Sequence, residues 1–561
     1  MRILFFTLYI FLFIRHVDGQ LVKQASKDSI GSHKIVLDKE GGWLSWYQPE
    51  VPGAAFTHVS EIASKFIHNG VPVDPTTGLK LYFIACGFDG PQMNSEEKFK
   101  SGKTWSHWLH NPACLYAGMV QSLVTGYRVY SGDSSYLDIV QDMLDYQLSH
   151  GTTPDNWLWA SVPYASSNGG DTIYHGGTQY STDGRGDGLY CLEPDKIAEL
   201  GNGYLTFYET TNKTKYLHAA MACADALGLH VRDTRQADST LSTGRADRSP
   251  WPFRVNARTN MPVSEYCSNV IEPIKLFDEL LRIKKRIQLS SEREISYIKG
   301  RNIAWEWLFS KNGPLKTYIW NAYFEDIPND TTRANRNQIT PLETARYLLK
   351  HYSDNPDVIK NIPVLIDWVK LVFSEPNMPA INEQTWCYEP MASHTARFAS
   401  VAALWYEYSK DEKYKEDAYR YFNFATYLAD TNGIIQVGPN WPGSWFSDGY
   451  GDYIRHFQEG VAAIPEWAPA TQNHLLRSSS MVQTIRYDPK HIRYSTFDDE
   501  SKEVFRLISK PLLITENGNT ISELNIYTPN QQGWIWEPLN HGGVLRLNHK
   551  KGTQMAIQLG R

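Results

Sequence analysis

The sequence has few of the features that would assign it to a class at once. It contains six cysteines in 561 residues, and none of them forms a CxxC pair. This excludes a disulfide framework, leaves one or two bridges open, and predicts that most thiols are buried. There is no long basic run and the net charge is −6, so nucleic acid is not an expected partner. The histidines lack zinc spacing. We expect no resident metal and no cofactor.

Long apolar runs are also scarce, and the one at the N-terminus is short. Arg2 precedes an apolar run at 3–14, and the tripeptide VDG follows at 17–19 as a cleavage site. This order is typical of a secretory signal peptide, and the run is too short to span a membrane. We expect a signal peptide at 1–19 and a secreted or periplasmic mature chain without a membrane span. No cysteine lies near the cleavage site, so we do not expect a lipid anchor there.

Aromatic residues are abundant, with 18 Trp, 33 Tyr and 22 Phe in a chain that is 42% hydrophobic. The length and composition suit a large globular protein of two or more domains. Many of these side chains belong to the core. However, Trp and Tyr recur beside Gly, Asn and Asp, a combination that suits the apolar faces and polar rims of sugars. We therefore expect a poly- or oligosaccharide as the partner.

The central part of the chain repeats one unit, which is a helix, a polar break and a second helix. Four of the first helices begin at an X-Pro pair, which suits a helix start because that turn needs no amide hydrogen. A sixth pair is expected from the segment around 461–485 and a helix near residue 60. The other expected pairs are 112–130 with 136–147, 194–208 with 216–229, 264–282 with 295–310, 341–352 with a helix ending at 371, and 390–408 with 414–428.

After about residue 482 the hydrophobic period changes from helical to alternating. Alternation over Ser522–Tyr527, 545–547 and 555–559, with turn sequences such as NHGG and HKKG between the runs, is typical of short antiparallel strands. The sequence therefore predicts a helical domain at 20–481 and a small β-sandwich or sheet at 482–561.

The stretch Glu383–Arg397 is the densest in candidate functional side chains. Pro390 opens a helix, so His394 and Arg397 are expected on one face near the N-terminal mouth of that helix, with apolar residues behind them. Other helix starts also carry polar side chains that could contact a substrate, among them Asn269. If these helices converge, their polar starts share one cleft.

Helix hairpins followed by a C-terminal β domain resemble the (α/α)-toroid family of carbohydrate-active enzymes, over nearly the whole mature chain. The resemblance implies a mainly α fold, an (α/α)6 toroid of the six-hairpin type with a small C-terminal antiparallel β-sandwich domain. The family includes glycoside hydrolases, sugar epimerases and polysaccharide lyases. The exported, Trp-rich arrangement looks most like enzymes of marine bacterial polysaccharide utilisation. It is similar to a dehydratase or lyase acting on ulvan-type, uronate-containing oligosaccharides.

Elimination beside a uronate carboxylate is the first hypothesis for the reaction. It needs a base, a group that stabilises the enolate-like anion, and an acid for the leaving oxygen. We assign the base to His394, because the free pKa of histidine, about 6.5, needs less adjustment than the value of about 10 for tyrosine. Tyr266 or Tyr388 is the acid, or an alternative base, and Asn269 and Arg397 neutralise the substrate carboxylate. The other expected substrate contacts are Trp386, Asp187, Tyr190, His110 and Trp445.

Three other interpretations remain open. A glycoside hydrolase needs two carboxylates about 5–10 Å apart, and the candidates are Asp187, Glu193, Glu265, Glu272 and Glu389. An epimerase would use histidines, and a binding module would need no catalytic group. Asp pairs in DGRGD (183–187) and DGYGD (448–452) could offer oxygens to Ca²⁺, but neither matches a calcium loop and solvated Gly-Asp turns are the favoured explanation.

Overall fold

The computed structural model describes residues 29–74, 76–85, 87–89, 109–178, 188–234, 248–321, 335–440, 443–528 and 530–560. The expected signal peptide and Asp187 lie outside these residues. Within them, no helix is both long enough and apolar enough to cross a membrane.

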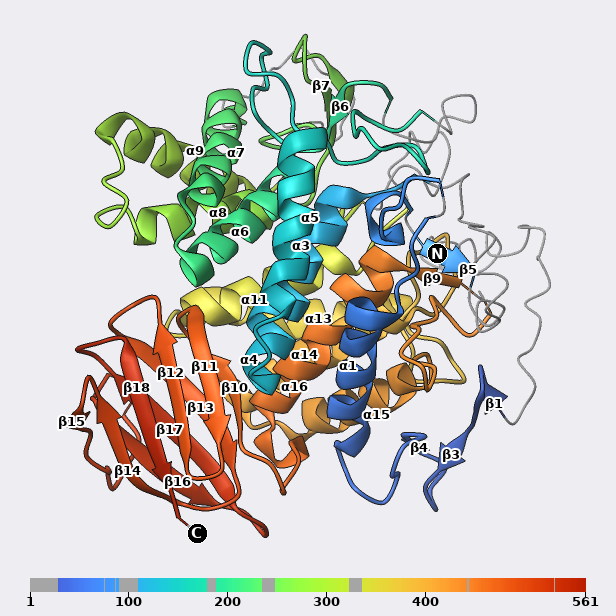
Figure 1. The fold of residues 1–561 in the computed structure, drawn as a ribbon. Helices are drawn as coiled ribbons and strands as arrows, with labels where there is room; N and C mark the ends of the chain where they lie inside the picture. Colours follow the sequence, from blue (N-terminus) through green and yellow to red (C-terminus); the bar gives the residue numbers. More distant parts are fainter. Residues whose placement is uncertain are drawn as a thin grey trace, which may run out of the picture.

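Six inner helices form a closed ring. Each one packs against the next, and α16 returns to the first, so that the ring closes (Figure 1). The first inner helix is continuous from α3 (Pro112–Met119) through the π-helical η4 (Val120–Tyr127) to α4 (Arg128–Ser131). The other five are α6 (Pro194–Thr211), α8 (Ile271–Arg282), α11 (Ile339–Tyr352), α14 (Ala392–Ser409) and α16 (Ile454–Ala463).

Six outer helices pack against the inner ones as hairpin partners. They are α5 (Tyr136–His150), α7 (Thr214–His230), α9 (Ser291–Phe309), α13 (Asn361–Phe373), α15 (Glu412–Thr426) and α1 (Ala54–Lys65). The last of these pairs with α16, so the predicted sixth hairpin joins the two ends of the helical domain. The predicted (α/α)6 toroid is confirmed, and apolar faces of both helix layers form one core.

Two predicted helix boundaries are wrong. Helix α8 begins at Ile271 and not at 264, because 262–264 form strand β8 (Pro262–Ser264). Tyr266 and Asn269 therefore precede the helix and do not share one of its faces. The predicted helical segment 461–485 is helical only in α16 and in a 3-10 turn, η6 (Pro465–Trp467), after which the chain becomes extended. A proline at 465 ends α16 because it cannot donate to the helix.

The C-terminal part is an antiparallel sandwich of two sheets, ordered β10-β13-β17-β16 and β11-β12-β18-β14-β15. The strands are β10 (His474–Ser478), β11 (Val482–Asp488), β12 (His491–Thr496), β13 (Ser501–Leu507), β14 (Pro511–Glu516), β15 (Asn519–Thr520), β16 (Gly533–Pro538), β17 (Gly543–His549) and β18 (Gln554–Leu559). Strand β10 belongs to this domain, which therefore starts near 474 and not at 482. Within the described residues, the run 522–527 makes only a single bridge, between Glu523 and Trp534, and is not a strand.

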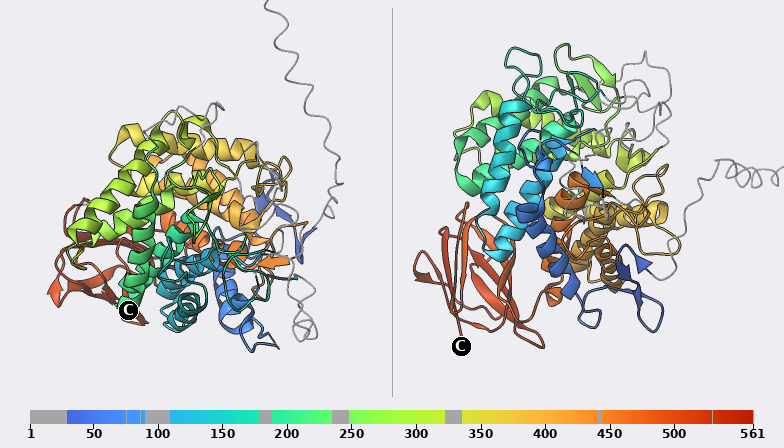
Figure 2. Two further views of the ribbon diagram at one scale, coloured as in Figure 1. Left: turned by 90° about the horizontal axis from the view of Figure 1, so that it is seen from above. Right: turned by 45° about the vertical axis from the view of Figure 1, so that its right-hand side comes forward.

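The β-sandwich lies against the C-terminal ends of inner helices, outside the ring (Figure 2). Arg282, at the end of α8, forms ion pairs with Glu209 near the end of α6 and with Asp498 of the sandwich. Arg286 follows α8, and its guanidinium lies 3.8 Å from the ring centre of Phe497. The sandwich does not cover the opposite end of the ring, where the inner helices begin.

The helical domain also contains short strands and helices outside its two layers. A three-stranded sheet, β6 (Cys191–Leu192), β7 (Arg254–Asn256) and β8, stands at the end where α6 and α8 begin. The remaining elements are β1 (Ser29–Ile30), β2 (His33–Lys34), β3 (Val36–Leu37), β4 (Trp43–Leu44), β5 (Gly87–Asp89), β9 (Gly443–Trp445), η1 (Phe66–Gly70), η2 (Leu81–Phe83), η5 (Phe446–Gly451), α10 (Pro314–Thr317) and α12 (Pro356–Ile359).

Candidate active site at the N-terminal mouth of the inner helices

Five of the six inner helices, all except α3, carry charged side chains in their first two turns. Five of the inner helices begin at or near a proline, which restricts the backbone at the helix start. Their N-terminal ends carry partial positive charge and favour carboxylates. The polar side chains delivered there include His110 before α3; Asp195, Lys196 and Glu199 of α6; Asn269 and Glu272 at α8; Glu343 and Arg346 of α11; His394 and Arg397 of α14; and Asp452, Arg455, His456 and Glu459 at α16.

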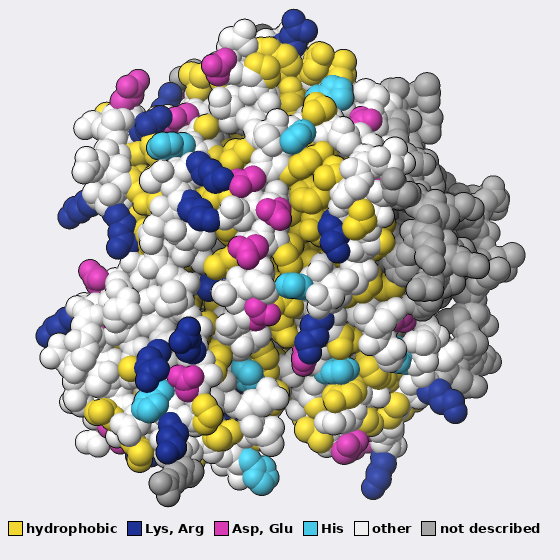
Figure 3. Space-filling view, viewed as in Figure 1, with side chains coloured by type: hydrophobic (Ala, Val, Ile, Leu, Met, Phe, Trp, Pro, Cys, Tyr) yellow, Lys and Arg dark blue, Asp and Glu magenta, His cyan; other side chains and the backbone are white. Residues whose placement is uncertain are grey.

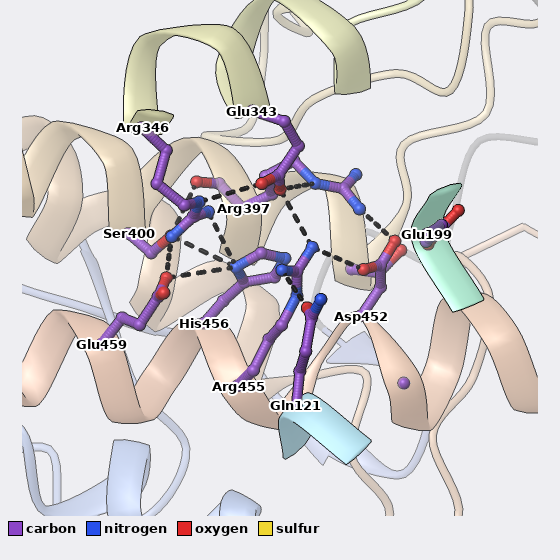
Figure 4. Close-up of polar contacts among 12 residues, drawn as sticks. Gln121, Glu199, Glu343, Arg346, Arg397, Ser400, Asp452, Arg455, His456 and Glu459 are labelled. Atoms are coloured by element: carbon purple, nitrogen blue, oxygen red, sulfur yellow. Dashed lines mark hydrogen bonds and ion pairs between the residues drawn. The ribbon is translucent and has the colours of Figure 1, made fainter. Parts of the chain in front are cut away.

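Arg397 is at the centre of an ion-pair network (Figure 4). Its Nε donates to Glu343 Oε1 at 3.1 Å, its Nη1 donates to His394 Nδ1 at 3.1 Å, and its Nη2 donates to Asp452. The side chain is 1% exposed. Every nitrogen of the guanidinium is already engaged, so this cation is not available to a substrate carboxylate.

Two further arginines complete the network. Arg455 Nη2 donates to Glu343 Oε1 and to Asp452 Oδ1, both at 2.9 Å. Arg346 Nε donates to Glu343 Oε2 at 3.1 Å, and Arg346 also pairs with Glu459. Burial alone would raise the pKa of Glu343, but the three arginines outweigh burial and hold the pKa far below its usual range. Removing one partner of a buried ion pair leaves the other charge unpaired, which costs more free energy than the pair itself contributes. The side chains of this network therefore hold one another in place and fix the geometry of the mouth.

Glu199 and Asp452 are neighbours with opposite protonation tendencies. Burial would raise the pKa of Asp452, but Arg397 and Arg455 outweigh burial and lower it to about 2. Burial raises the pKa of Glu199 above 4.5; Lys196 opposes this rise, and the carboxylates of Glu272 and Asp452 add to it. The side chains are 20% and 15% exposed, more than that of Arg397. The site therefore holds one carboxyl group biased towards the acid and one that stays ionised.

Asp452 is held in place by a close backbone approach. A Cβ on Gly118 of α3 would lie 2.8 Å from the Cα of Gly451, so only glycine fits at this crossing. Ser122 of η4 donates its hydroxyl to Gly451 O at 2.6 Å and accepts from the Arg455 backbone N–H at 3.1 Å. The first inner helix thus positions the residues that lead into α16.

A small polar pocket lies at the start of α8. It is lined by Asp195, Phe253, Cys267, Ser268, Asn269, Asn321, Asn337 and Thr340. Asn269 Nδ2 donates to Asp195 Oδ2 at 3.3 Å, while its buried Oδ1 has no hydrogen-bond partner among the described residues. Burial raises the pKa of Asp195, against the effects of Lys196 and Asn269. A buried amide oxygen without a partner is unusual in a folded protein and sets this pocket apart.

The structure brings the predicted residues His394 and Arg397 together. Arginine can only donate, so His394 Nδ1 accepts from Arg397 and the ring proton belongs on Nε2. Burial, followed by the charge of Arg397, lowers the pKa of His394 to about 3. A group with this pKa is a weak base near neutral pH. The base role of His394 stays a prediction, and its environment does not favour it.

The other predicted residues are spread around the mouth. Tyr266 is buried, and its hydroxyl donates to Ile319 O at 3.1 Å. Tyr388 and Trp386 are 70% and 44% exposed. His110 is fully buried, neither ring nitrogen has a hydrogen-bond partner in the described part of the chain, and burial lowers its pKa to about 3. Tyr190 lies at the β6 end of the rim, Trp445 lies in β9, and Asp187 is outside the described residues.

The predicted hydrolase carboxylates have partners, as Glu199 has in Lys196 at 3.0 Å. Glu193 forms an ion pair with Arg254 at 2.8 Å, Glu265 with Arg232 at 2.6 Å, and Glu272 with Lys275 at 2.7 Å. Glu389 accepts from the backbone N–H of Asn440. Sequence reasoning did not select Glu199, Glu343 or Arg455. The available signal was the i, i+4 spacing of Asp195 and Glu199 after the Pro194 helix start.

Metal ligands do not cluster in the described part of the chain: no three His, Cys, Asp or Glu side chains there could hold one ion. Of the two Asp pairs considered for Ca²⁺, 183–187 lies outside those residues. In the second, Asp452 is bound to arginines.

No protein-family model matches the chain, and no curated protein matches it. Among solved structures, it is similar to a D-mannose isomerase (12% identity, 73% of this chain and 96% of the other, TM-score 0.49). It is also similar to cellobiose 2-epimerase from Spirochaeta thermophila (11%, 73% and 97%, 0.49) and to a polysaccharide lyase (12%, 73% and 99%, 0.42). These neighbours, like the glycosyl hydrolases that also match, are toroid enzymes acting on carbohydrates. At such identities and TM-scores the likeness carries no argument about activity.

Proposed function

We propose that the protein is a carbohydrate-active enzyme that hydrolyses a glycosidic bond at the mouth of the toroid. The observation that carries this proposal is the split between Glu199, whose pKa is raised, and Asp452, whose pKa is lowered to about 2. A glycoside hydrolase needs one carboxyl group to protonate the leaving oxygen and a second, ionised one to activate water or attack the sugar. The aromatic-rich mouth fits a saccharide.

Each residue has a defined role in this proposal. Glu199 is the proton donor, because burial and the neighbouring carboxylates raise its pKa. Asp452 is the ionised partner, oriented by Arg397 and Arg455. It attacks the sugar as the nucleophile, because a pKa of about 2 makes it too weak a base to activate water. We also propose that the enzyme is exported, because the N-terminal segment has the order of a signal peptide.

Replacing the acid tests the proposal. Glu199→Gln should lower turnover by about 10²- to 10⁴-fold, the usual contribution of a general acid, and Asp452→Asn should have a similar effect. Glu209→Gln is the matched control, because Glu209 is a buried carboxyl on the same helix but at the opposite end. It should retain turnover. Circular dichroism and thermal unfolding check that each variant is folded. Full turnover in a folded Glu199→Gln variant would refute this assignment.

Elimination at a uronate-containing glycan such as ulvan is the second candidate. It is favoured by the pocket at α8, where Asp195 has a raised pKa and is bonded to Asn269. A carboxyl group kept neutral by burial can donate a hydrogen bond to an enolate-like anion. His394 and Tyr388 remain the proposed acid–base groups for that reaction, with Tyr266 as the alternative.

Mass spectrometry of products from uronate-containing polysaccharides separates the two candidates. Hydrolysis adds water across the broken bond. A lyase gives fragments whose masses sum to that of the substrate, together with ultraviolet absorbance from an unsaturated uronate. A dehydratase product loses water without chain cleavage.

A further inference from the structure

A tight turn at the tip of the β7–β8 hairpin presents Arg258 at the rim of the mouth. Asn256 Oδ1 accepts from the backbone N–H of Arg258 at 3.0 Å, from that of Thr259 at 3.2 Å, and from the Thr259 hydroxyl at 3.2 Å. These three bonds fix the turn, and the Arg258 side chain is exposed.

Two aromatic rings support the Arg258 guanidinium. Its Cζ lies 5.4 Å from the ring centre of Trp157 and 5.7 Å from that of Tyr190. The two rings are themselves edge to face, with centres 5.1 Å apart. Tyr190 has a φ of 62°, in the left-handed region that non-glycine residues rarely adopt. Strain of this kind is often stored where a side chain must be aimed at a functional site.

Arg258 differs from the arginines of the central network in its partners. Arg346, Arg397 and Arg455 each contact at least one carboxylate. No carboxylate or carbonyl oxygen in the described residues accepts from the Arg258 guanidinium. The structure therefore holds a planar cation in place on two rings, with its hydrogen-bond donors open to solvent.

We propose that Arg258, Trp157 and Tyr190 form a subsite for a uronate residue of the glycan, in which Arg258 binds the carboxylate. This deepens the proposed function and rests on it for the identification of the glycan as the substrate. A guanidinium matches a carboxylate with two parallel hydrogen bonds. Leu158, which follows Trp157 in the chain, and Met261 and Val263, at the β8 side of the hairpin, are exposed apolar side chains and suit the apolar face of a pyranose ring. Figure 3 shows hydrophobic side chains gathered at the top of the molecule, over β6 and β7.

Arg258 supplies the positive charge for the substrate carboxylate, a role that the sequence analysis predicted for Arg397. Because Arg397 is 1% exposed and each of its guanidinium nitrogens already donates to Glu343, His394 or Asp452, it cannot turn to a substrate carboxylate without breaking that network. Arg258 can do so without breaking any ion pair of the described residues. The substrate class that follows is an anionic, uronate-bearing oligo- or polysaccharide.

Affinity electrophoresis of the full chain tests the subsite. The gels contain polygalacturonate, glucuronan, a sulfated galactan or neutral dextran. We expect at least one uronate polysaccharide to retard the wild type, and dextran not to. Arg258→Gln should weaken that binding about tenfold or more, the equivalent of losing one bidentate charged contact. Arg486→Gln is the control, because it removes the same charge from an exposed position on β11 of the sandwich, and it should bind as the wild type does.

A second variant separates the ring from the charge. Tyr190→Asn keeps a residue that tolerates the left-handed backbone but removes the ring, and it should also weaken binding. Wild-type-like retardation of Arg258→Gln would overturn the proposal, as would retardation by the sulfated galactan alone or by none of the uronate gels. Products are assayed in parallel on the same polysaccharides. Arginine-dependent binding without any product would leave the subsite standing and remove the proposed reaction.

Discussion

Glu199 and Asp452 show how two carboxyl groups at one mouth acquire different chemistry. Asp452 lies against two arginines and has a pKa of about 2, while Glu199 has one lysine partner and two carboxylate neighbours. The difference comes from the placement of charge and not from residue type. A search for catalytic carboxylates that looks only at the residue before a helix-opening proline would overlook both.

The pH profile of kcat/KM should reflect this split. A proton donor works only when protonated, so the rate should fall as pH rises through the raised pKa of Glu199, above the ordinary value of 4.5. Asp452 is ionised above about pH 2, so it gives no rising limb in the usual range. Initial rates on the substrate identified by product analysis, measured from pH 3 to 10, give the profile.

The same measurement tests the histidine. A rising limb near pH 6.5 would mean that a base with the ordinary histidine pKa is at work, contrary to the value of about 3 for His394. The residual activity of Glu199→Gln should lack the falling limb. A falling limb that survives in this variant would belong to another group.

Only part of the site could be predicted at the residue scale. His394 and Arg397 follow from a proline-opened helix, which is a local signal, and the structure does bring them together. Their pKa values and partners depend on Glu343 and Asp452, which are distant in sequence. Arg258 carried no local signal, because its partners Trp157 and Tyr190 lie on a different loop.

Among the elements, the first inner helix packs closely against the backbone that leads into α16. Gly118→Ala would place a methyl group 2.8 Å from the Cα of Gly451, so α3 and η5 must separate and Asp452 must shift. Overpacking of this kind typically costs about 1–3 kcal/mol. We expect lower unfolding midpoints in urea together with reduced kcat.

Gly203→Ala is the matched control for that variant. Gly203 is in α6, another inner helix, and an added Cβ would meet its nearest atom, the Cα of Ala117, at 3.4 Å. The substitution should be neutral or stabilise by up to about 1 kcal/mol through helix propensity. If both alanines behaved alike, the close approach would not explain the effect at 118.

Helix pairs were the most predictable elements, for a physical reason. Proline starts, apolar spacing of three and four, and polar breaks are all encoded within a single helix and the turns that flank it. The boundary errors occur where tertiary pairing decides: β8 joins β7 before α8 can begin, and β10 pairs with β13 and not with β11, the next strand along the chain. The order of strands in the sandwich has no local signal at all.

On the scale of the whole molecule, the sandwich and the mouth are at opposite ends of the inner helices. The sandwich should therefore contribute stability and not catalysis. Arg286→Ala removes the contact with the Phe497 ring and a 2.7 Å hydrogen bond to Phe497 O. We expect a loss of about 1–2 kcal/mol in unfolding free energy, measured in urea, with kcat/KM unchanged.

Lys285→Ala provides the comparison, because Lys285 is an exposed neighbour of Arg286. Lys285→Ala should change neither the unfolding free energy nor kcat/KM. A change in kcat/KM for Arg286→Ala at a temperature where the protein is fully folded would show that the sandwich influences the mouth.

The hairpin of α1 and α16 closes the ring with helices from the two ends of the helical domain. During synthesis, five hairpins can form as they leave the ribosome, but the sixth must wait for α16. Because Asp452 and Arg455 arrive with that last helix, a nascent chain ending before 452 would lack one half of the carboxyl pair and the arginine beside it. The growing protein is therefore an incomplete ring of helices. The proposed carboxyl pair is completed in the same step that closes the ring.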